Sequence, residues 1–471
     1  MVATFICKNT KIEYCFNSPT LISELFLKAG ISYPFLCDEK GICGKCKVKA
    51  TGKLSPVTES EKSLLSEKEI KQGVRLACCT FALSSLTIDY NTEIVKHQAF
   101  LDNIFKNFSQ NKKYHLAYDI GTTTLEFCIT DICSHKKQHI TIPNPQSQFG
   151  DNIISRIEYE NNNGSVELQK CLREPFEYIL KNLNVEKCVV TGNTTMLHFF
   201  NKISAKEMAS YPFKPKDKFG YEKENIYYPP CVSAFIGADT VCGAFDIDIQ
   251  SCENTLFVDI GTNGEIMYFN NGKIKCCSVA AGPAFEGFSV RNGASARDGA
   301  IEKVYIENNK ICYKTVNNEK PFAITGSGII DLISCLLDKN ILKKDGFLKD
   351  KYYFDNSDIF ISPEDVRNIQ LAKAAVKAGI DILCKDGAKK IYIAGNFGNH
   401  LDIDNCIKIG LFPEYFKGRA EFVGNASLNG ACKLLDEENR EKINSIVSIC
   451  ETVEFAGTEE FSKKFIESMN F

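Results

Sequence analysis

The chain has 471 residues, enough for about three folding units at roughly 150 residues each, which excludes a single small module. Its composition of 44% hydrophobic and 24% charged residues is ordinary for a globular protein and excludes a mostly disordered or collagen-like chain. The 56 Lys and Arg residues are balanced by 59 Asp and Glu residues, so a net charge of −3 offers no basic field for nucleic acid. Neither an N-terminal targeting pattern nor an apolar run of about 18 residues is found, which predicts a cytoplasmic protein without nucleic-acid or membrane partners.

Residues 1–90 predict a self-contained domain of short strands and two short helices. Ser18 followed by Pro19 is typical of a helix N-cap and first helical position. Thr58 and Glu61 form a capping-box pair that opens the second helix. The predicted strands cover 2–7, 11–16, 45–50 and 86–90, and the predicted helices end at Gly30 and Gly73. This order of elements is β-grasp-like.

The sequence contains 22 cysteines, which suit three uses: disulfides, metal or cluster ligands, and small buried apolar side chains. A long chain without a secretory signal is expected in a reducing compartment, which disfavours disulfides. Most of the cysteines lie singly in apolar runs, and we predict that they are buried. Examples are Cys128, Cys188, Cys242, Cys312 and Cys450.

One group of cysteines has the spacing of a cluster site. Three lie on one loop as C-x5-C-x2-C, and a fourth follows much later, before a strand. Zinc sites usually show two close pairs, whereas this asymmetric arrangement is typical of 2Fe-2S ferredoxins; zinc stays the alternative. Gly41 and Gly44 would give the loop tight turns, and Cys79 competes with its neighbour as the last ligand. The predicted 2Fe-2S ligands are Cys37, Cys43, Cys46 and Cys78.

A duplication organises the rest of the chain. Residues 91–113 are polar and rich in Asn and Lys, which predicts a linker or a short bridging helix. After the linker, strands and helices alternate, as in α/β folds. The segment 116–124 (LAYDIGTTT) recurs in outline at 256–264 (LFVDIGTNG), and each copy lies between two short strands. Two such distant copies predict two homologous lobes within 114–471, with the lobe switch near 235–255.

Local patterns predict the elements of these lobes. The second copy continues through Asn271-Gly272, the strongest two-residue hairpin signal, into a strand over 273–279. Helices are predicted at 151–159, 166–182, 194–201, 329–337, 363–384 and 426–435, and further strands at 187–191 and 390–394.

The repeated Asp-Ile-Gly-Thr turns are candidates for binding phosphates. No P-loop is present, and Gly326-Ser327-Gly328 is too short for a dinucleotide fingerprint. The turns offer backbone N–H groups, hydroxyls and a carboxylate suited to Mg²⁺. Facing each other across a cleft, they would clamp the phosphates of a nucleotide, while Asp119 and Asp259 hold the water ligands of the metal or orient the attacking water. The predicted phosphate-binding residues are Gly121, Thr122, Thr123, Gly261, Thr262 and Asn263.

A third Gly-rich turn follows the strand at 390–394. Its glycines would let the backbone approach a nucleoside, so Gly395, Asn396 and Gly398 are predicted to lie there. A plain turn between a strand and a helix is the alternative.

These motifs carry a resemblance to known families. The paired turns and the Gly-rich turn resemble the actin, sugar-kinase and heat-shock ATPase (ASKHA) superfamily. Together with the N-terminal 2Fe-2S pattern, four further segments resemble the reductive activators of corrinoid-dependent methyltransferase systems. These segments are Asn144-Pro145-Gln146, 191–198, 281–287 and Gly326-Ser327-Gly328. The resemblance covers nearly the whole chain, implies a two-lobe actin-like ATPase domain, and adds Gly282, Gly326 and Gly328 to the nucleotide site.

The resemblance also implies a function. In that family, the cluster supplies a low-potential electron that returns Co(II) corrinoid to Co(I), and ATP hydrolysis drives the transfer. The implied partners are a corrinoid protein and an upstream low-potential electron donor. Some relatives carry a longer linker with a small domain that helps dimerisation, so homodimerisation stays open here. The alternative function is a sugar or small-metabolite kinase with a regulatory cluster, in which Asp239 would serve as general base.

Four further residues each have two interpretations. His198 is a proton carrier or, more simply, a core residue. Glu286 contacts a ribose or caps the following helix. Arg291 and Arg297 bind phosphate or a partner carboxylate, or lie on a solvated surface.

Overall fold

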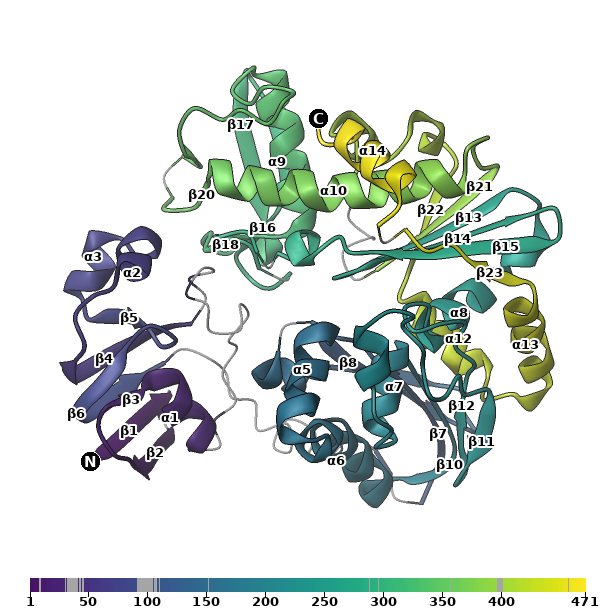
Figure 1. Ribbon diagram of the computed structural model, residues 1–471, viewed down its shortest axis with the longest axis horizontal. Coiled ribbons are helices and arrows are strands. Elements are labelled where there is room, and N and C mark those ends of the chain that lie inside the picture. Colours follow the sequence, from purple (N-terminus) through teal and green to yellow (C-terminus); the bar gives the residue numbers. More distant parts are fainter. Residues whose placement is uncertain are drawn as a thin grey trace. The chain divides into compact units, whose positions relative to one another are not determined.

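In a computed structural model, the chain folds into two compact units, whose elements are labelled in Figure 1. The first unit comprises Met1–His115, Ile120–Glu186 and Thr195–Lys216, and the second comprises Leu116–Asp119, Lys187–Thr194 and Asp217–Phe471. The sequence-based domain limits stay a prediction. The structure describes residues 1–7, 10–29, 31, 41, 44, 46–90, 105, 108–109, 111–150, 152–287, 289–294, 296–355, 357–395, 401–455 and 457–471.

The N-terminal part of the first unit is a six-stranded mixed sheet. Its elements are β1 (Val2–Cys7), β2 (Thr10–Cys15), β3 (Thr20–Leu21), α1 (Ile22–Lys28), β4 (Lys47–Leu54), β5 (Val74–Leu76) and β6 (Phe81–Asp89). The strand order is β2-β1-β6-β4-β5 with β3 on β6, and β1 runs parallel to β6. Phe26 of α1 packs edge to face on Phe5 and Tyr90, with ring centroids 4.8 and 5.0 Å apart. The predicted β-grasp order is confirmed.

The first helix starts later than the sequence predicts. Thr20 and Leu21 pair antiparallel with β6 as strand β3, and α1 begins only at Ile22. The prediction of a helix from Pro19 is therefore wrong. The sheet edge supplies backbone hydrogen bonds to these residues that a local N-cap signal does not reveal.

The second predicted helix is in fact two helices, α2 (Glu59–Leu64) and α3 (Glu67–Lys71). The expected capping box of Thr58 and Glu61 opens α2. A second capping box, formed by Ser66 and Glu69, opens α3 and interrupts the helix that was expected to continue to Gly73. Two successive capping boxes in the sequence are the signal that distinguishes two helices from one.

Glu61 also forms the main polar contact of this domain's core. It is fully buried, and Arg75 donates two hydrogen bonds to it, at 2.8 Å from Nε and 2.9 Å from Nη2. The backbone N–H of Leu76 (3.0 Å), the hydroxyl of Thr80 (2.9 Å) and the backbone N–H of Thr58 (2.9 Å) also donate to it. Burial alone would raise the pKa of Glu61, but the Arg75 guanidinium and these donors outweigh it and hold the pKa at about 2.

A second six-stranded sheet carries the first Asp-Ile-Gly-Thr copy at the end of β7. Its strands are β7 (Lys113–Ile120), β8 (Thr124–Asp131), β9 (Lys137–Pro143), β10 (Asn184–Gly192), β11 (Tyr221–Lys223) and β12 (Ile226–Tyr228). The chain between these strands also forms the helices α5 (Ile153–Asn163), α6 (Val166–Asn182) and α7 (Thr194–Phe200). The strand order is β11-β12-β10-β7-β8-β9. The helix predicted at 166–182 is found with those bounds, and the one predicted at 151–159 begins two residues later and runs on to Asn163.

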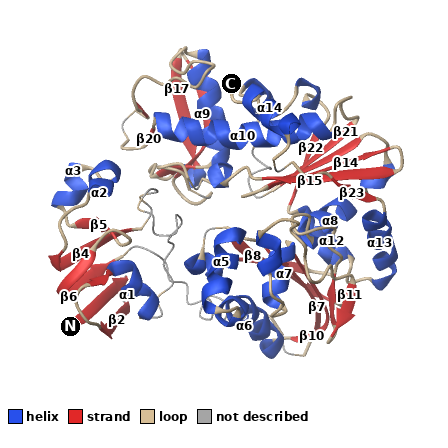
Figure 2. Cartoon of the chain, in the orientation of Figure 1, coloured by secondary structure: helices blue, strands red, loops and turns tan. Residues whose placement is uncertain are grey.

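A third six-stranded sheet, in the second unit, carries the second copy (Figure 2). Its elements are β13 (Thr255–Ile260), β14 (Gly264–Asn270), β15 (Lys273–Val279), β21 (Lys390–Ala394), β22 (Ala420–Gly424) and β23 (Cys450–Thr452), with helices α8 (Ala238–Asp246), α10 (Pro363–Leu383) and α12 (Ala426–Lys433) in the same unit. The order is β22-β21-β13-β14-β15-β23. The predicted hairpin at Asn271-Gly272 joins β14 to β15.

The second and third sheets share one strand pattern. In each, the strand that ends in Asp-Ile-Gly-Thr, β7 or β13, is followed on one side by the next two strands of the chain. On its other side lies a later strand, β10 or β21. This repeated order agrees with the predicted α/β core of two homologous lobes.

The C-terminal segment packs on α10. The elements that complete the second unit include β16 (Ala300–Glu307), β17 (Lys310–Thr315), β18 (Ala323–Ile324), α9 (Gly326–Asp338), α13 (Arg440–Ser448) and α14 (Glu459–Glu467). Lys373 of α10 is fully buried and donates to the carbonyl of Ser468 at 2.6 Å and to that of Asn470. The N–H of Phe471 donates to the carbonyl of Lys344 at 2.8 Å.

The cysteines of the described part are free thiols. Cys128, Cys188 and Cys242 are buried, as predicted. Cys312 and Cys450 are half-exposed, so the prediction of complete burial is wrong for these two. Both lie on strands at the edge of their sheets, where one side of a strand has no neighbour.

The buried pair of Glu61 and Arg75 generates a stability prediction. Arg75→Met should leave a buried carboxylate without its cation and lower the free energy of unfolding of the N-terminal sheet by about 3–5 kcal/mol. Because the pKa of Glu61 lies below that of an unfolded glutamate, the wild-type contribution is complete above about pH 4.5 and is lost as the pH falls towards 2. Amide hydrogen exchange of β4 to β6 measures both effects.

The matched control is Lys62→Met, which removes an exposed ion pair with Glu59 in the same region. That change should cost less than about 1 kcal/mol. Equal protection of β4 to β6 in the Arg75 and Lys62 variants would contradict the structural role of the buried pair.

Candidate functional site

The first Asp-Ile-Gly-Thr turn leads from β7 into β8. A Cβ on Gly121 would lie 2.7 Å from the carbonyl oxygen of Thr124, so the turn requires glycine at this position. The carbonyl of Gly121 accepts a hydrogen bond from Asn144 Nδ2 at 2.8 Å, and the carbonyl of Thr122 accepts one from Arg156 Nη2 at 2.7 Å. Two side chains that lie later in the sequence thus fix the backbone of the turn.

Asp119 ends β7 just before this turn. Its side chain is buried, and its Oδ2 accepts a hydrogen bond from Asn425 Nδ2 at 3.3 Å. Asn425 is also the N-cap of α12, because its Oδ1 accepts the N–H of Leu428 at 2.8 Å. Asn425 is not among the predicted site residues, and its position directly before a predicted helix is the available sequence signal.

The second turn leads from β13 into β14 and contacts a glutamate. The N–H of Gly261 donates to the carbonyl of Asn263 at 2.8 Å within the turn. Thr262 Oγ1 donates to Glu286 Oε2 at 2.9 Å. Glu286 ends a short 3-10 helix, Pro283–Glu286. Neither the ribose nor the helix-cap interpretation anticipated this contact with the turn.

Several half-buried carboxylates gather near the second turn. Burial, together with the charges of Asp239 and Glu286, raises the pKa of Asp259 to about 7. Burial also raises the pKa of Asp239 to about 6, and burial with the charges of Asp239 and Asp259 raises the pKa of Glu265 well above its usual range. Burial and mutual repulsion therefore both oppose the ionisation of these neighbouring carboxylates.

Asp239 reaches this cluster through a close backbone approach. A Cβ on Gly237, which precedes α8, would lie 2.5 Å from the Cα of Asn193 and 2.8 Å from the N of Thr194. Position 237 must therefore be glycine for the start of α8 to pack this closely on the turn that follows β10. The segment 191–198, singled out in the sequence, therefore helps to position Asp239.

Gly395 lies beside the second turn. Strand β21 runs parallel to β13 with Ala394 opposite Asp259, and Gly395 follows with φ +116°. A Cβ on Gly395 would overlap the carbonyl oxygen of Ile260. The structure thus brings the third Gly-rich turn next to the second copy. Asn396 and Gly398 lie outside the described residues.

Two other predicted glycines, Gly326 and Gly328, allow close packing of the backbone. A Cβ on Gly326 would overlap the carbonyl oxygen of Phe285, and one on Gly328 would lie 2.5 Å from that of Ile301. These contacts bring the start of α9 against the 3-10 helix that carries Glu286. Gly282 has φ +73° and open space around its Cβ position. Nucleotide binding by these glycines stays a prediction.

The described part of the cysteine group fits a cluster site. The sulfur atoms of Cys46 and Cys78 lie 3.2 Å apart, and both side chains are buried. Cys79 Sγ lies 3.6 Å from that of Cys78. Gly41 has φ +67°, and a Cβ there would come within 2.7 Å of Cys79 Sγ, so the loop has a glycine where a larger residue would fill the space. Cys37 and Cys43 lie outside the described residues.

Among the residues that the structure describes, no group of three or more His, Cys, Asp or Glu side chains is arranged to hold a metal ion. The four-cysteine set is not tested by this result, because two of its members are not described. In the same part of the chain, no helix is long and apolar enough to cross a membrane.

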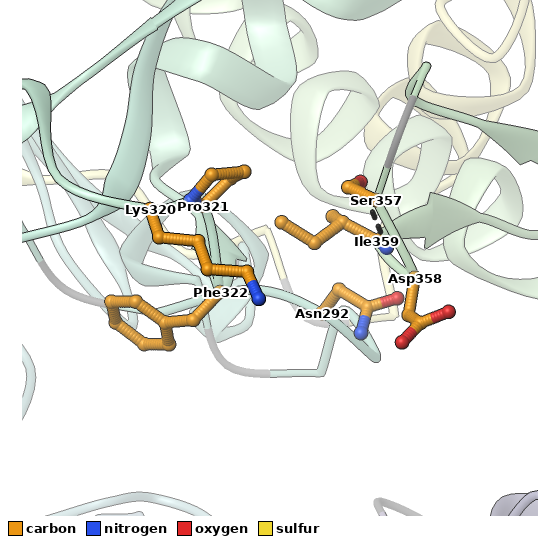
Figure 3. Close-up of a pocket in the computed structure, with 7 residues that line it drawn as sticks. All are labelled: Asn292, Lys320, Pro321, Phe322, Ser357, Asp358 and Ile359. Carbon is orange, nitrogen blue, oxygen red and sulfur yellow. Dashed lines mark hydrogen bonds between the residues drawn. The ribbon is translucent and has the colours of Figure 1, made fainter.

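A pocket of about 710 Å³ lies in the second unit, away from the predicted site residues (Figure 3). Its lining residues are Asn292, Lys320, Pro321, Phe322, Ser357, Asp358 and Ile359. Ser357 Oγ accepts the N–H of Ile359 at 3.1 Å inside it. None of its lining residues belongs to the turns or to the cysteine group, so it is not the predicted nucleotide site.

The remaining candidates have structural roles. His198 is fully buried in α7, as the simpler interpretation expects. Arg291 pairs with Glu364 at 3.3 Å, and the Arg297 guanidinium lies 4.6 Å from the ring centroid of Phe322. These contacts give both arginines protein partners and do not identify a phosphate site.

Three family models match the chain. They are the 2Fe-2S iron-sulfur cluster binding domain at residues 6–83, the RACo middle region at 114–251, and the C-terminal domain of RACo, the ASKHA domain, at 253–471. The matches and the fold define the class of protein: a 2Fe-2S ferredoxin-type domain followed by an ASKHA-type domain.

Relatives match over most of the chain. The chain is 28% identical to the corrinoid activation enzyme RamQ of Eubacterium limosum over 97% of both proteins. It is 24% identical to the Co(II) methylated amine-specific corrinoid protein reductase of Methanosarcina barkeri, over 72% of this chain and 73% of that one. The solved structure of a reductive activator for corrinoid, iron-sulfur protein has a TM-score of 0.69 at 26% identity and covers 99% of this chain and 98% of its own. The chain belongs to the RACo family.

The carboxylate cluster yields a pH prediction. The folded protein holds a proton on Asp259 more tightly than an unfolded chain does, so ionisation destabilises the fold increasingly from about pH 4 to pH 7. Asp259→Asn should therefore raise the melting temperature by a few degrees, and by more at pH 8 than at pH 5, in the absence of nucleotide and divalent metal.

The control is Asp350→Asn, which changes an exposed carboxylate of the same unit and should leave the melting temperature unchanged at both pH values. Calorimetry at the two pH values measures the difference. An equal or smaller gain at pH 8 would contradict the assigned burial and charge repulsion at Asp259.

Proposed function

We propose that this protein is an ATP-dependent reductive activator that transfers an electron from a 2Fe-2S cluster to the Co(II) corrinoid of a partner protein and regenerates Co(I). The observation that carries the proposal is the fusion, in one chain, of a ferredoxin-type domain with a duplicated ASKHA core, matched over 97% of both chains by a corrinoid activation enzyme. The partner would be a corrinoid protein, and an upstream low-potential donor would reload the cluster in the cytoplasm. Self-association is a separate question for measurement.

The proposed cluster ligands are Cys37, Cys43, Cys46 and Cys78. When bound, the cluster supplies a single low-potential electron. Cys46 and Cys78 support the assignment, because their sulfur atoms are buried and 3.2 Å apart without a disulfide. Glu61 positions Cys78, since its carboxylate binds the N–H of Leu76 and the hydroxyl of Thr80 on either side of this cysteine.

The proposed nucleotide site uses both repeated turns, with Gly395 to Gly398 near the nucleoside. Asp119 and Asp259 would act through the water shell of Mg²⁺ or orient the attacking water. No group of three or more described carboxylates is arranged as a metal site, so the proposed role of Asp119 and Asp259 rests on the repeated Asp-Ile-Gly-Thr motif. Glu286 would hold the Thr262 hydroxyl in place through its 2.9 Å hydrogen bond.

ATP is needed for a thermodynamic reason. For a one-electron step, about 59 mV is a tenfold change in equilibrium, so a gap of a few hundred millivolts leaves almost no reduced product without assistance. Nucleotide binding and hydrolysis would supply the missing free energy by favouring one state of the complex.

The proposed domains are a ferredoxin-type domain at 1–90, a linker at 91–113 and an ATPase domain at 114–471, with the lobe switch near 235–255.

The decisive experiment is an anaerobic assay with purified protein, Mg-ATP, a chemical reductant and candidate Co(II) corrinoid proteins. The Co(I) absorption should appear only with ATP, and ATP turnover should rise when the corrinoid partner is added. Asp259→Ala should lose both signals and keep its visible cluster spectrum. Hydrolysis that responds to a small hydroxylated metabolite and releases a phosphorylated product would instead identify a kinase.

A separate measurement tests the ligand set and the competition between Cys78 and Cys79. Cys78→Ser should lose the visible absorption and cobalt reduction but keep nucleotide binding. Cys79→Ser, the matched neighbouring change, should retain iron and sulfide at wild-type levels. Zinc in the purified protein, or loss of the cluster only in the Cys79 variant, would overturn the assignment.

A further inference from the structure

The two copies of the Asp-Ile-Gly-Thr turn are stabilised by side chains of opposite charge. In the first copy, the Thr122 carbonyl accepts a hydrogen bond from the guanidinium of Arg156. In the second copy, the Thr262 hydroxyl donates to the carboxylate of Glu286. The two turns belong to one sequence pattern, so the difference lies in what the rest of the chain places against them.

Arg156 is held rigidly behind the first turn. Its side chain is only 1% exposed. Besides the bond to Thr122, its Nε donates to the carbonyl of Gly150 at 2.9 Å and its Nη1 to Gln146 Oε1 at 3.2 Å. Its Nη1 also lies 3.6 Å from Met196 Sδ. Because the guanidinium is planar with donors in fixed directions, these contacts leave it one orientation.

Asn144 completes the same arrangement. Its Nδ2 donates to the Gly121 carbonyl at 2.8 Å, and its Oδ1 accepts the N–H of Gln146 at 2.9 Å. Asn144 is fully buried. Two consecutive carbonyls of the turn are therefore bound by side chains from the protein interior. The sequence segment Asn144-Pro145-Gln146 acquires a physical role as part of this support.

The direction of these carbonyls matters for an anionic ligand. A carbonyl oxygen that faced a phosphate would repel it, whereas backbone N–H groups attract it. A carbonyl that is hydrogen-bonded on the buried side cannot turn towards the ligand without breaking that bond. The positive charge of Arg156 behind the turn adds a favourable field for a phosphate.

We propose that Arg156 is a positioning residue for nucleotide phosphates: through its hydrogen bond to the Thr122 carbonyl, it fixes the peptide orientation of the turn Gly121–Thr123 for phosphate binding. This inference rests on the proposed ATP-binding function and adds to it a buried residue that controls the backbone of one of the two turns. Arg156 acts through the Thr122 backbone and does not contact the ligand. The bonds to Gly150 and Gln146 hold Arg156 itself in place.

The test compares Arg156→Met with Arg173→Met. Arg173 is a matched control in the same unit, because its Nε donates to the Phe200 carbonyl at 3.0 Å and its guanidinium packs 4.0 Å from the Phe200 ring. Equilibrium binding of a non-hydrolysable ATP analogue and of adenosine is measured in the holoprotein, together with the melting temperature and the cluster spectrum.

We expect Arg156→Met to weaken binding of the ATP analogue by roughly tenfold to a hundredfold and to leave adenosine binding within about twofold. Its KM for ATP should rise more than its kcat falls. Arg156→Lys should recover part of the affinity, since an ammonium retains the charge and one donor. Arg173→Met should leave both affinities unchanged.

Other outcomes overturn the inference. Equal losses for the ATP analogue and adenosine, or losses in both arginine variants in proportion to their melting temperatures, would mean a purely structural role. If Arg156→Met does not fold, Asn144→Ser, which removes the anchor of the Gly121 carbonyl, should show the same selective loss in smaller degree, and its absence would count against the inference. If Arg156→Met binds ATP with normal affinity while Asp259→Ala loses ATP hydrolysis, the inference about Arg156 is refuted but the proposed ATP site is not. A wild-type protein that binds no nucleotide would refute both the inference and the proposed ATP site.

Discussion

A charged side chain can be buried only where the surrounding structure supplies its hydrogen bonds, and this constraint shapes both candidate sites. The Glu61 carboxylate accepts six hydrogen bonds and so ties the start of α2 to the segment that contains Cys78. Arg156 donates hydrogen bonds to the carbonyls of Thr122 and Gly150 and to the side chain of Gln146. In each case, one buried charge holds together backbone from segments that are separate in the sequence.

Much of the architecture could be predicted from local signals. The β-grasp order, the hairpin at Asn271-Gly272 and the helix at 166–182 follow from turn chemistry and periodicity within a few residues. The duplication was visible because both copies keep the same tetrapeptide at the end of a strand. The sequence contains two successive capping boxes, and the second, Ser66 with Glu69, is the local signal that separates α3 from α2.

The rest depends on contacts between residues that are distant in sequence. Strand β3 exists because β6 lies beside it, which no pattern around Pro19 reveals. Asn425 reaches Asp119 across 306 positions, and Glu286 reaches Thr262 across 24. Arg156 lies in a predicted helix whose other residues give no hint that its side chain reaches the Thr122 carbonyl. Sequence motifs therefore located the turns, whereas the groups that control them required the fold.

The attachment of the C-terminal tail has a practical consequence for handling the protein. Lys373 donates to the backbone carbonyls of Ser468 and Asn470, and the Lys344 carbonyl accepts the N–H of Phe471. The Lys373 Nζ also lies 5.3 Å from the centroid of the Phe471 ring. An affinity tag joined after Phe471 would leave those bonds intact. Deletion of 468–471 would instead leave a buried ammonium group without its two acceptors, a change that costs several kcal/mol in typical interiors.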